Sequence, residues 1–203
     1  MGKQGKEAVS TNAIAEQMDT KASSVTDMVK KLAEKDLVNY VKYQGVNLTK
    51  IGRITAALIV RKHRLWEVFL VEKLKFSWDE VHDVAEQLEH IKSEKLIDEL
   101  DAFLGYPKED PHGDPIPDND GNIIKSEKIL LSQVNIGTSC VCAGVKNSTV
   151  KFLQYLDKTK IALGSEINVI SKEPFDQSMT IALNGPEVTI SSITANNLYV
   201  LKN

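Results

Sequence analysis

The order of local patterns in the first 48 residues most constrains the fold. Residues 11–18 and 23–35 each place apolar side chains at helical spacing, and a polar break at 19–22 separates them. An alternating run over residues 37–43, followed by the turn Gln44-Gly45, predicts a β-hairpin. A helix, a turn, a helix and a hairpin in this order predict a helix-turn-helix unit with a wing, an arrangement typical of proteins that contact DNA.

Helical patterns dominate the next part of the chain. Thr49 is expected to cap a long amphipathic helix that runs to about Leu74. The capping-box spacing from Ser77 to Glu80 predicts a second helix over residues 77–91. A third helix is predicted over residues 94–104, because Ser93 can cap its start and Gly105 can end it.

The rest of the chain changes character. Residues 107–128 contain four of the six prolines, which predicts an extended linker. Beyond it, short alternating stretches separated by turn residues predict a small, mostly β barrel; they cover residues 166–170, 179–183, 188–190 and 198–201. The predicted division is a DNA-binding unit at 1–52, a helical unit at 53–106, a linker at 107–128 and a β domain at 129–203.

The net charge of −3 hides an uneven distribution. Residues 1–75 contain 14 Lys and Arg against 8 Asp and Glu, residues 76–128 contain 5 against 15, and residues 129–203 contain 6 against 5. A basic segment followed by an acidic one suits a polyanion-binding unit joined to a cation-binding unit. Solvated helix faces of uneven charge would give the same counts.

No feature of the sequence predicts export or membrane insertion. No apolar run approaches the roughly 18 residues that span a bilayer, and the first residues lack the apolar core of a signal peptide. The two cysteines, Cys140 and Cys142, are too close in sequence for a useful structural disulfide. The expected compartment is therefore the reducing cytoplasm, without a membrane partner.

Histidines and carboxylates gather at helical spacing in two segments. His63 and Glu67 lie four residues apart on one helix face. A second stripe, with spacings of four, three and one residues, comprises His82, Glu86, Glu89 and His90. Imidazole and carboxylate ligands without thiolates suit Mn²⁺ or Fe²⁺. For the first pair alone a solvated helix surface is the better interpretation, but the longer stripe favours a metal site. His112, in the linker, is expected to be structural.

Three segments resemble the family of the diphtheria toxin repressor and the manganese transport regulator. They are Arg61-Lys62-His63-Arg64-Leu65, the stripe from His82 to His90, and Pro111-His112-Gly113-Asp114-Pro115-Ile116-Pro117. The resemblance covers nearly the whole chain. It implies a mainly α N-terminal winged helix-turn-helix and helical dimerisation domain, plus a small all-β SH3-like C-terminal domain. It also implies a homodimer that binds a double-stranded DNA operator when loaded with Mn²⁺ or Fe²⁺.

The resemblance further implies two metal sites, one made of His63, Glu67 and His82 and one made of Glu86, Glu89 and His90. Glu86 stands where iron-responsive members carry a cysteine, which favours Mn²⁺. There are two departures. The helix that precedes the helix-turn-helix in the family, and donates a ligand to the second site, is expected to be absent here. The Glu and Gln that the C-terminal domain of some members supplies are missing from residues 137–147.

The resemblance also implies how DNA is contacted. The helix that starts near Ser23 would enter the major groove, where the closest side chains are those of Lys21, Ala22, Ser23 and Ser24. Phosphate contacts are expected from Thr11, Asn12, Thr26, Lys30, Tyr43 and Gln44. Simple helix capping is an equally good role for the hydroxyl residues of the second helix.

The sequence therefore predicts a metal-dependent transcriptional repressor, activated by Mn²⁺ or Fe²⁺ and controlling genes of metal-ion homeostasis, and not an enzyme. One alternative is a winged-helix regulator that senses a small organic ligand. A metallohydrolase is a further, weaker alternative, because the sequence contains no H-E-x-x-H helix and no nucleophile motif.

Overall fold

The computed structural model describes residues 8–124 and 126–202 of the chain, which form two compact units. The first unit ends at Val60 and adds the short segment Pro117–Asn122. The second unit comprises Arg61–Ile116 and the chain from Ile123 onward. One long helix, α3 (Lys50–Glu72), contributes its first half to one unit and its second half to the other. The predicted division into four parts stays a prediction.

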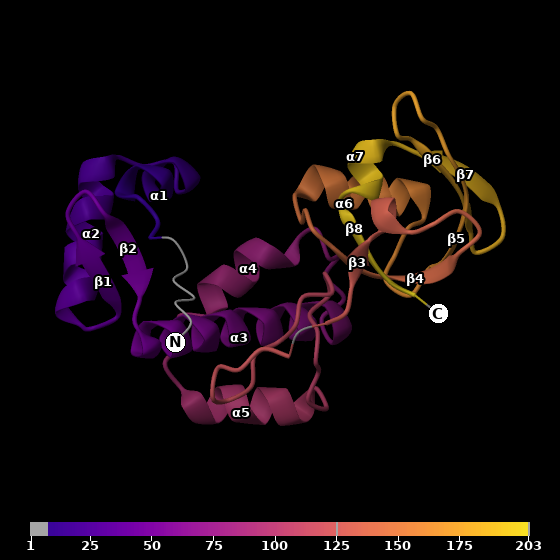
Figure 1. The fold of residues 1–203 in the computed structure, drawn as a ribbon. Helices are drawn as coiled ribbons and strands as arrows, with labels where there is room; N and C mark the ends of the chain where they lie inside the picture. Colours follow the sequence, from indigo (N-terminus) through magenta and orange to yellow (C-terminus); the bar gives the residue numbers. More distant parts are fainter. Residues whose placement is uncertain (1–7, 125, 203) are drawn as a thin grey trace, which may run out of the picture. The chain divides into compact units, whose positions relative to one another are not determined.

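The first unit is the predicted winged helix-turn-helix (Figure 1). Its elements are α1 (Thr11–Gln17), α2 (Ala22–Glu34), β1 (Val38–Val41) and β2 (Gly45–Leu48). The Ser10 hydroxyl caps α1 by accepting a hydrogen bond from the amide of Ala13 at 3.1 Å. The two strands pair antiparallel, and apolar side chains from every element form a small core of Ala15, Val25, Val29, Val38 and Val46.

The start of α3 is fixed against the wing. The Thr49 hydroxyl accepts a hydrogen bond from the Gly52 amide at 2.9 Å and donates one to the carbonyl of Asp36 at 2.6 Å. Gly52 packs so closely on the chain before β1 that a Cβ atom there would overlap the carbonyl oxygen of Leu37. Only glycine therefore allows the helix to approach the wing this closely.

Gly52→Ala should accordingly destabilise the first unit by about 1–3 kcal/mol, the usual cost of overpacking, although alanine is the better helix former. The measurement is urea denaturation of the full chain followed by circular dichroism. Ile51→Ala, at a neighbouring position that is 59% exposed, serves as the control and should change the stability little. Equal midpoints for the wild type and Gly52→Ala would show that this contact is not tight.

In the second unit, the remainder of α3 packs with α4 (Val81–Leu88) and α5 (Glu94–Phe103). Their shared core contains Leu65, Trp66, Val68, Leu70, Val81, Ala85, Ile97, Leu100 and Ile116. α4 is shorter than the predicted helix at 77–91, because residues at each end form separate turns. The amide of Glu80 bonds the carbonyl of Ser77 at 3.1 Å, and the amide of Ile91 bonds that of Leu88 at 3.1 Å.

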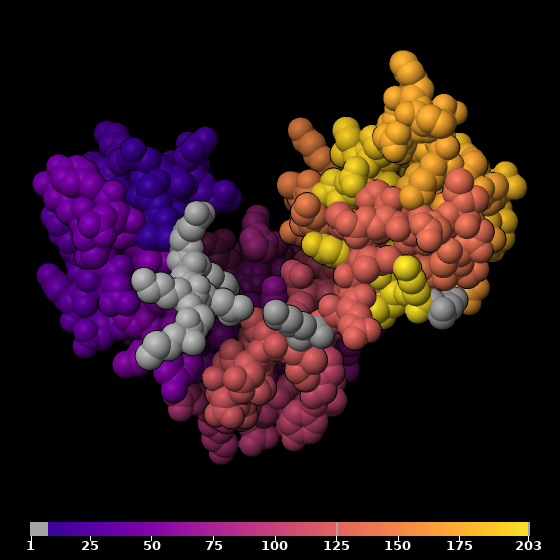
Figure 2. Space-filling view, in the orientation of Figure 1, coloured from indigo at the N-terminus to yellow at the C-terminus, as the bar shows by residue number. Residues whose placement is uncertain are grey.

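Residues 129–202 form a body that is coloured salmon to yellow in Figure 2. This body is built on one antiparallel sheet. The strand order is β3-β8-β4-β5-β6-β7. The strands are β3 (Ile129–Leu130), β4 (Ser139–Val145), β5 (Glu166–Lys172), β6 (Met179–Leu183), β7 (Glu187–Ile190) and β8 (Leu198–Lys202). The four strands predicted from alternation are all present, with ends shifted by at most two residues. The fold class is therefore confirmed.

The β domain also contains helices that the sequence analysis did not predict. The main one is α6 (Val150–Thr159), and two short helical segments are Leu131–Gln133 and α7 (Ser192–Ala195). α6 lies on the sheet through Leu153 and Leu156, which are fully buried. Thr149 occupies the N-cap position of α6, but its side chain makes no capping hydrogen bond.

The proline-rich segment is more ordered than a linker. Its central residues Asp110, His112 and Gly113 are buried. The His112 carbonyl accepts a hydrogen bond from the amide of Val145 in β4 at 2.9 Å. A Cβ atom on Gly113 would overlap the backbone of Ala143, so this loop and β4 are in close contact. The segment thus connects the helices of the second unit to its sheet.

None of the helices in the part of the chain that the structure describes has both the length and the apolar surface that crossing a bilayer requires.

Candidate metal centre

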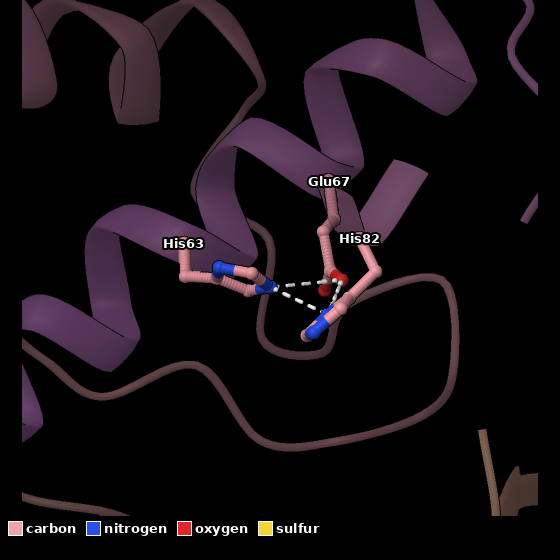
Figure 3. Close-up of side chains that lie close together, drawn as sticks. All are labelled: His63, Glu67 and His82. Atoms are coloured by element: carbon pink, nitrogen blue, oxygen red, sulfur yellow. Dashed lines mark hydrogen bonds and ion pairs between the residues drawn. The ribbon is translucent and has the colours of Figure 1, made fainter. Parts of the chain in front are cut away.

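Two helices bring the first predicted ligand set together (Figure 3). His63 and Glu67 extend from α3, and His82 extends from the first turn of α4. Nε2 of His63 lies 3.1 Å from Oε1 of Glu67 and 3.2 Å from Nδ1 of His82. His82 Nδ1 lies 3.6 Å from the same carboxylate oxygen. Three side chains from two helices thus direct one ligand atom each toward a common point.

The carboxylate of Glu67 is the electrostatic centre of this arrangement. Its side chain is only 3% exposed, and burial alone would raise its pKa. Hydrogen bonds and favourable charge from His112 and His63 outweigh burial and lower the pKa to about 2. Glu67 is therefore ionised throughout the physiological range, a buried negative charge faced by imidazoles.

A second cluster shares Glu67 and uses the loop after α5. Oε2 of Glu67 lies 3.8 Å from Nδ1 of His112, and Asp110 completes a group whose ligand atoms lie within 4.8 Å of one another. All three residues are buried. Nε2 of His112 lies 2.8 Å from the carbonyl oxygen of Trp78. Because a carbonyl can only accept, Nε2 carries the proton and donates it, which leaves Nδ1 of the neutral ring free to act as a ligand.

Arg64 holds the loop that carries Asp110. Its guanidinium lies 3.3 Å from Oδ2 of Asp110 and 3.3 Å from Oδ2 of Asp114. Oδ1 of Asp110 accepts hydrogen bonds from the amides of His112 and Asp114, at 2.8 and 2.9 Å. Burial nevertheless raises the pKa of Asp110 to about 6. The metal-free cluster therefore has one carboxyl group that gains a proton readily in mild acid.

The other predicted ligands are arranged differently from the expectation. Glu89 lies beside His63, with 2.8 Å between its Oε2 and Nδ1 of the imidazole. Glu86 and His90 are exposed, and α4 ends at Leu88, so that His90 lies beyond the helix. Within residues 8–124 and 126–202 the structure does not gather Glu86, Glu89 and His90 into one ligand group. Their role as a second site stays a prediction.

Sequence reasoning did not assign Asp110 or His112 to the site. His112 was expected to be structural, and Asp110 received no role. A signal was present, since both lie in the loop whose Pro-His-Gly-Asp-Pro run carried part of the family resemblance. Only the fold, however, shows that this loop returns to Glu67 on α3.

The predicted DNA-contacting residues lie on the first unit. Thr11, Asn12, Thr26 and Tyr43 line one surface hollow together with Lys42. Tyr43, at the tip of the wing, is 92% exposed. The others named at the start of α2 are exposed or partly exposed, and Lys30 forms an ion pair with Asp27 at 3.8 Å. The hydroxyl of Thr26 donates to the carbonyl of Ala22 at 2.8 Å, so in the free protein it has a local partner.

The ligand atoms fit a divalent first-row metal ion. Both clusters offer only imidazole nitrogens and carboxylate oxygens, which suit Mn²⁺ and Fe²⁺. The thiols of Cys140 and Cys142 are buried in the core of the β domain and belong to neither cluster. An ion held here would neutralise the buried charge of Glu67 and supply the link between α3, α4 and the Asp110 loop.

The protonation of two imidazoles makes ion binding depend on pH. Burial alone would lower the pKa values of His63 and His112, but hydrogen bonding and charge from Glu67, and also from Glu89 for His63, raise them above 6.5. A metal ion must displace these protons, so Mn²⁺ affinity should rise as the pH increases through and beyond 6.5.

The stability of the metal-free chain should change in the opposite direction. The raised pKa values stabilise the fold fully below pH 6.5, and this contribution is lost as the pH rises through the folded-state values. The increase in melting temperature caused by Mn²⁺ should therefore grow between pH 6 and pH 8. Thermal unfolding with Mn²⁺ and with chelator tests this, and an increase that is constant with pH would contradict the assignment of these ligands.

Comparisons with known proteins agree with this fold. Three family models match the chain in the expected order: the iron dependent repressor N-terminal DNA binding domain over residues 2–46, the iron dependent repressor metal binding and dimerisation domain over 49–118, and the FeoA domain over 129–202.

Curated relatives match over shorter or longer parts of the chain. The chain is 36% identical over 104 residues to the iron-dependent repressor IdeR of Mycobacterium tuberculosis, a match covering 51% of this chain and 45% of that protein. It is 25% identical over 198 residues to the diphtheria toxin repressor of Corynebacterium diphtheriae, covering 92% and 86%. A match of 43% identity to a probable metal transport system membrane protein of Chlamydia trachomatis covers 42% of this chain and 19% of that protein. The matched region thus spans less than half the length of two of these relatives.

Solved structures match more completely. A manganese-dependent transcriptional repressor in complex with manganese has a TM-score of 0.88 and 36% identity, covering 99% of this chain and 94% of that one. The manganese regulator SloR has a TM-score of 0.75 and 36% identity, covering 96% and 90%. A winged helix, a helical metal-binding module and a FeoA domain together define a class of metal-dependent transcriptional repressors. The chain belongs to the iron- and manganese-dependent repressor family that includes the diphtheria toxin repressor.

Proposed function

We propose that this chain is a cytoplasmic, Mn²⁺- or Fe²⁺-dependent repressor that binds a double-stranded DNA operator as a homodimer and controls genes of metal-ion homeostasis. The observation that carries the proposal is the position of Glu67, whose two carboxylate oxygens face imidazoles from two different clusters. The names of the related structures, which include a manganese-bound repressor, support the choice of ion.

The mechanism rests on charge and on the continuity of α3. The helix begins directly after the wing and carries His63 and Glu67 further along. Without a metal ion, the carboxylates of Glu67 and Glu89 both lie against the imidazole of His63. With an ion bound, the ligands on α3 and α4 are held at fixed separations. In a dimer, this would restrict the two DNA-binding units to the spacing of an operator, so that ion and DNA affinities become linked reciprocally.

The ligand types favour Mn²⁺ over softer ions. The clusters contain no thiolate, and carboxylates are the ligands that hard cations prefer. Because Mn²⁺ binds more weakly than later first-row ions to almost any ligand set, its selection would depend on availability in the cell as well as on these ligands.

A direct test uses DNA that the protein itself selects. Fragments of genomic DNA from the source organism are retained on the full chain in Mn²⁺ and then used in mobility-shift assays. We expect the wild type to retain DNA in Mn²⁺ and to release it when chelator is added. In the His63→Ala and His82→Ala variants, Mn²⁺ should no longer increase the retention of DNA. The proposal would be contradicted if the wild type bound DNA equally well with and without chelator. If a small organic ligand were the effector, chelator would not release the DNA.

A matched control separates ligand loss from general damage. Lys158→Ala changes an exposed side chain on α6 that belongs to neither cluster nor to the DNA-contacting set. This variant should keep the dependence on Mn²⁺. Sedimentation of each variant, with the wild type, tests whether the homodimer is retained when the ligand residues are changed.

A further inference from the structure

Trp78 lies between the buried metal cluster and the FeoA-like β domain. It occupies the turn that precedes α4, four residues before His82. Three separate parts of this residue make contacts: its carbonyl, its ring and its indole N–H. Each contact can be followed to a different element of the second unit.

On the cluster side, the carbonyl of Trp78 accepts the hydrogen bond from Nε2 of His112 at 2.8 Å. The ring of Trp78 stacks on the same imidazole, with 6.2 Å between ring centroids and 14° between planes. One residue thus determines both the tautomer and the tilt of His112, whose Nδ1 faces Glu67. Partners of this kind orient a ligand without touching the ion.

On the other side, the indole N–H donates to Oδ1 of Asp157 on α6 at 3.0 Å. The ring also packs against the apolar core of the β domain. Next to it, Oδ2 of Asp79 accepts a hydrogen bond from Gln154, one turn earlier on α6, at 2.9 Å. The backbone of His112 reaches the same domain through Val145. The cluster and the β domain are therefore joined through a short series of direct contacts.

We propose that Trp78 is a positioning residue that couples ion binding at Glu67, Asp110 and His112 to the attachment of the β domain through α6. The inference rests on the proposed function, since it requires that the cluster binds a divalent ion. A His112 ring held by an ion fixes the position of Trp78, and a fixed Trp78 keeps its hydrogen bond to Asp157. By reciprocity, a change that weakens the contact between Trp78 and α6 must also weaken ion binding.

The test compares four variants of the full chain. Trp78→Phe keeps an aromatic ring for stacking but removes the N–H donor. Asp157→Leu removes the acceptor, Asp157→Asn keeps an acceptor oxygen, and Lys158→Leu removes a charge at the next, exposed position. Mn²⁺ affinity is measured by calorimetry, and amide hydrogen exchange of residues 150–159 is measured with Mn²⁺ and with chelator.

In the wild type we expect Mn²⁺ to slow amide exchange in α6. Trp78→Phe and Asp157→Leu should each lose most of this slowing and bind Mn²⁺ about tenfold more weakly, the lower end of the range for residues that orient a ligand. The double variant should be no worse than either single one, because both remove the same hydrogen bond. Asp157→Asn and Lys158→Leu should behave like the wild type.

A purely structural role gives a different pattern. Trp78→Phe and Asp157→Leu would then lower the melting temperature equally with and without Mn²⁺, while the slowing of exchange by Mn²⁺ would persist; that result overturns the inference. Additive losses in the double variant would also overturn it. If the wild type binds no Mn²⁺, the proposed function fails as well. If His112→Ala loses Mn²⁺ binding but Trp78→Phe and Asp157→Leu do not, only the coupling through Trp78 fails.

Discussion

Replacing Glu67 by glutamine is expected to cause the largest loss of Mn²⁺ binding of any single substitution in this protein. Glutamine has nearly the same shape but cannot supply a charged ligand. One oxygen of Glu67 belongs to the cluster with His63 and His82 and the other to the cluster with His112, so both lose their shared carboxylate. Because residues that only orient a ligand cost about 10–100-fold in affinity, a ligand common to both clusters should cost more than about 100-fold.

The same substitution should also change the response of the metal-free protein to acid. The pKa of Glu67 is lowered to about 2 in the fold, so its charge stabilises the native state above pH 4.5. That contribution is lost as the pH falls from 4.5 toward 2. Glu67→Gln should therefore show a shallower loss of stability over this range in acid denaturation. Glu72→Gln, at a half-exposed position on the same helix, is the control for a change of charge.

Calorimetry with Mn²⁺ decides the first part of this prediction. Isotherms of Glu67→Gln that match the wild type would mean that the ion binds elsewhere. A loss confined to one of two binding events would mean that only one of the two clusters accepts an ion.

Replacing Asp101 by leucine is expected to cause the largest loss of stability. Asp101 on α5 and Arg61 on α3 form an ion pair of 2.8 Å between Oδ2 and a guanidinium nitrogen. Arg61 is 5% exposed and Asp101 is 9% exposed. Removing one member of a buried ion pair typically costs about 3–5 kcal/mol. For a chain of this size the melting temperature should fall by roughly 10 °C.

The double variant Arg61→Met with Asp101→Leu distinguishes the charge from the packing. It removes both charges and replaces them with apolar groups, which is often neutral or even stabilising. We therefore expect the double variant to be more stable than Asp101→Leu alone. Thermal unfolding of the chelated chain provides the measurement. A double variant as unstable as the single one would show that the pair contributes through its shape instead of its charge balance.

The spacing of apolar residues and the helix-capping residues predicted most of the fold, because both depend on residues that are close together in the sequence. Ser10, Thr49 and Ser93 each accept the capping hydrogen bond that their position before a helix suggests. Strands β5 to β8 follow their alternation. The helix α6 was missed because the alternating stretches around it indicated a strand-rich domain, although Leu153 and Leu156 have helical spacing and Thr149 stands at its N-cap.

The candidate site was predictable only in part, for a related reason. His63 and Glu67 share a helix face, and the spacing by itself brings them together. Asp110 and His112 approach Glu67 only because Arg64 and the contacts with β4 fold the proline-rich loop back onto α3, and no periodicity encodes this contact. Of the stripe at 82–90, His82 lies with His63 and Glu67, whereas Glu86, Glu89 and His90 form no ligand group within the described residues, and their role as a second site stays a prediction.

Anomalous diffraction at the manganese edge, from crystals of the full chain grown with Mn²⁺, measures most directly whether Glu67 is the centre of ion binding. Our account predicts a peak within coordination distance of a Glu67 carboxylate oxygen and of at least one of the imidazoles of His63, His82 and His112. Two results would contradict it. One is a peak found only near Glu86 and His90, and the other is the absence of any peak although the same protein binds Mn²⁺ in solution.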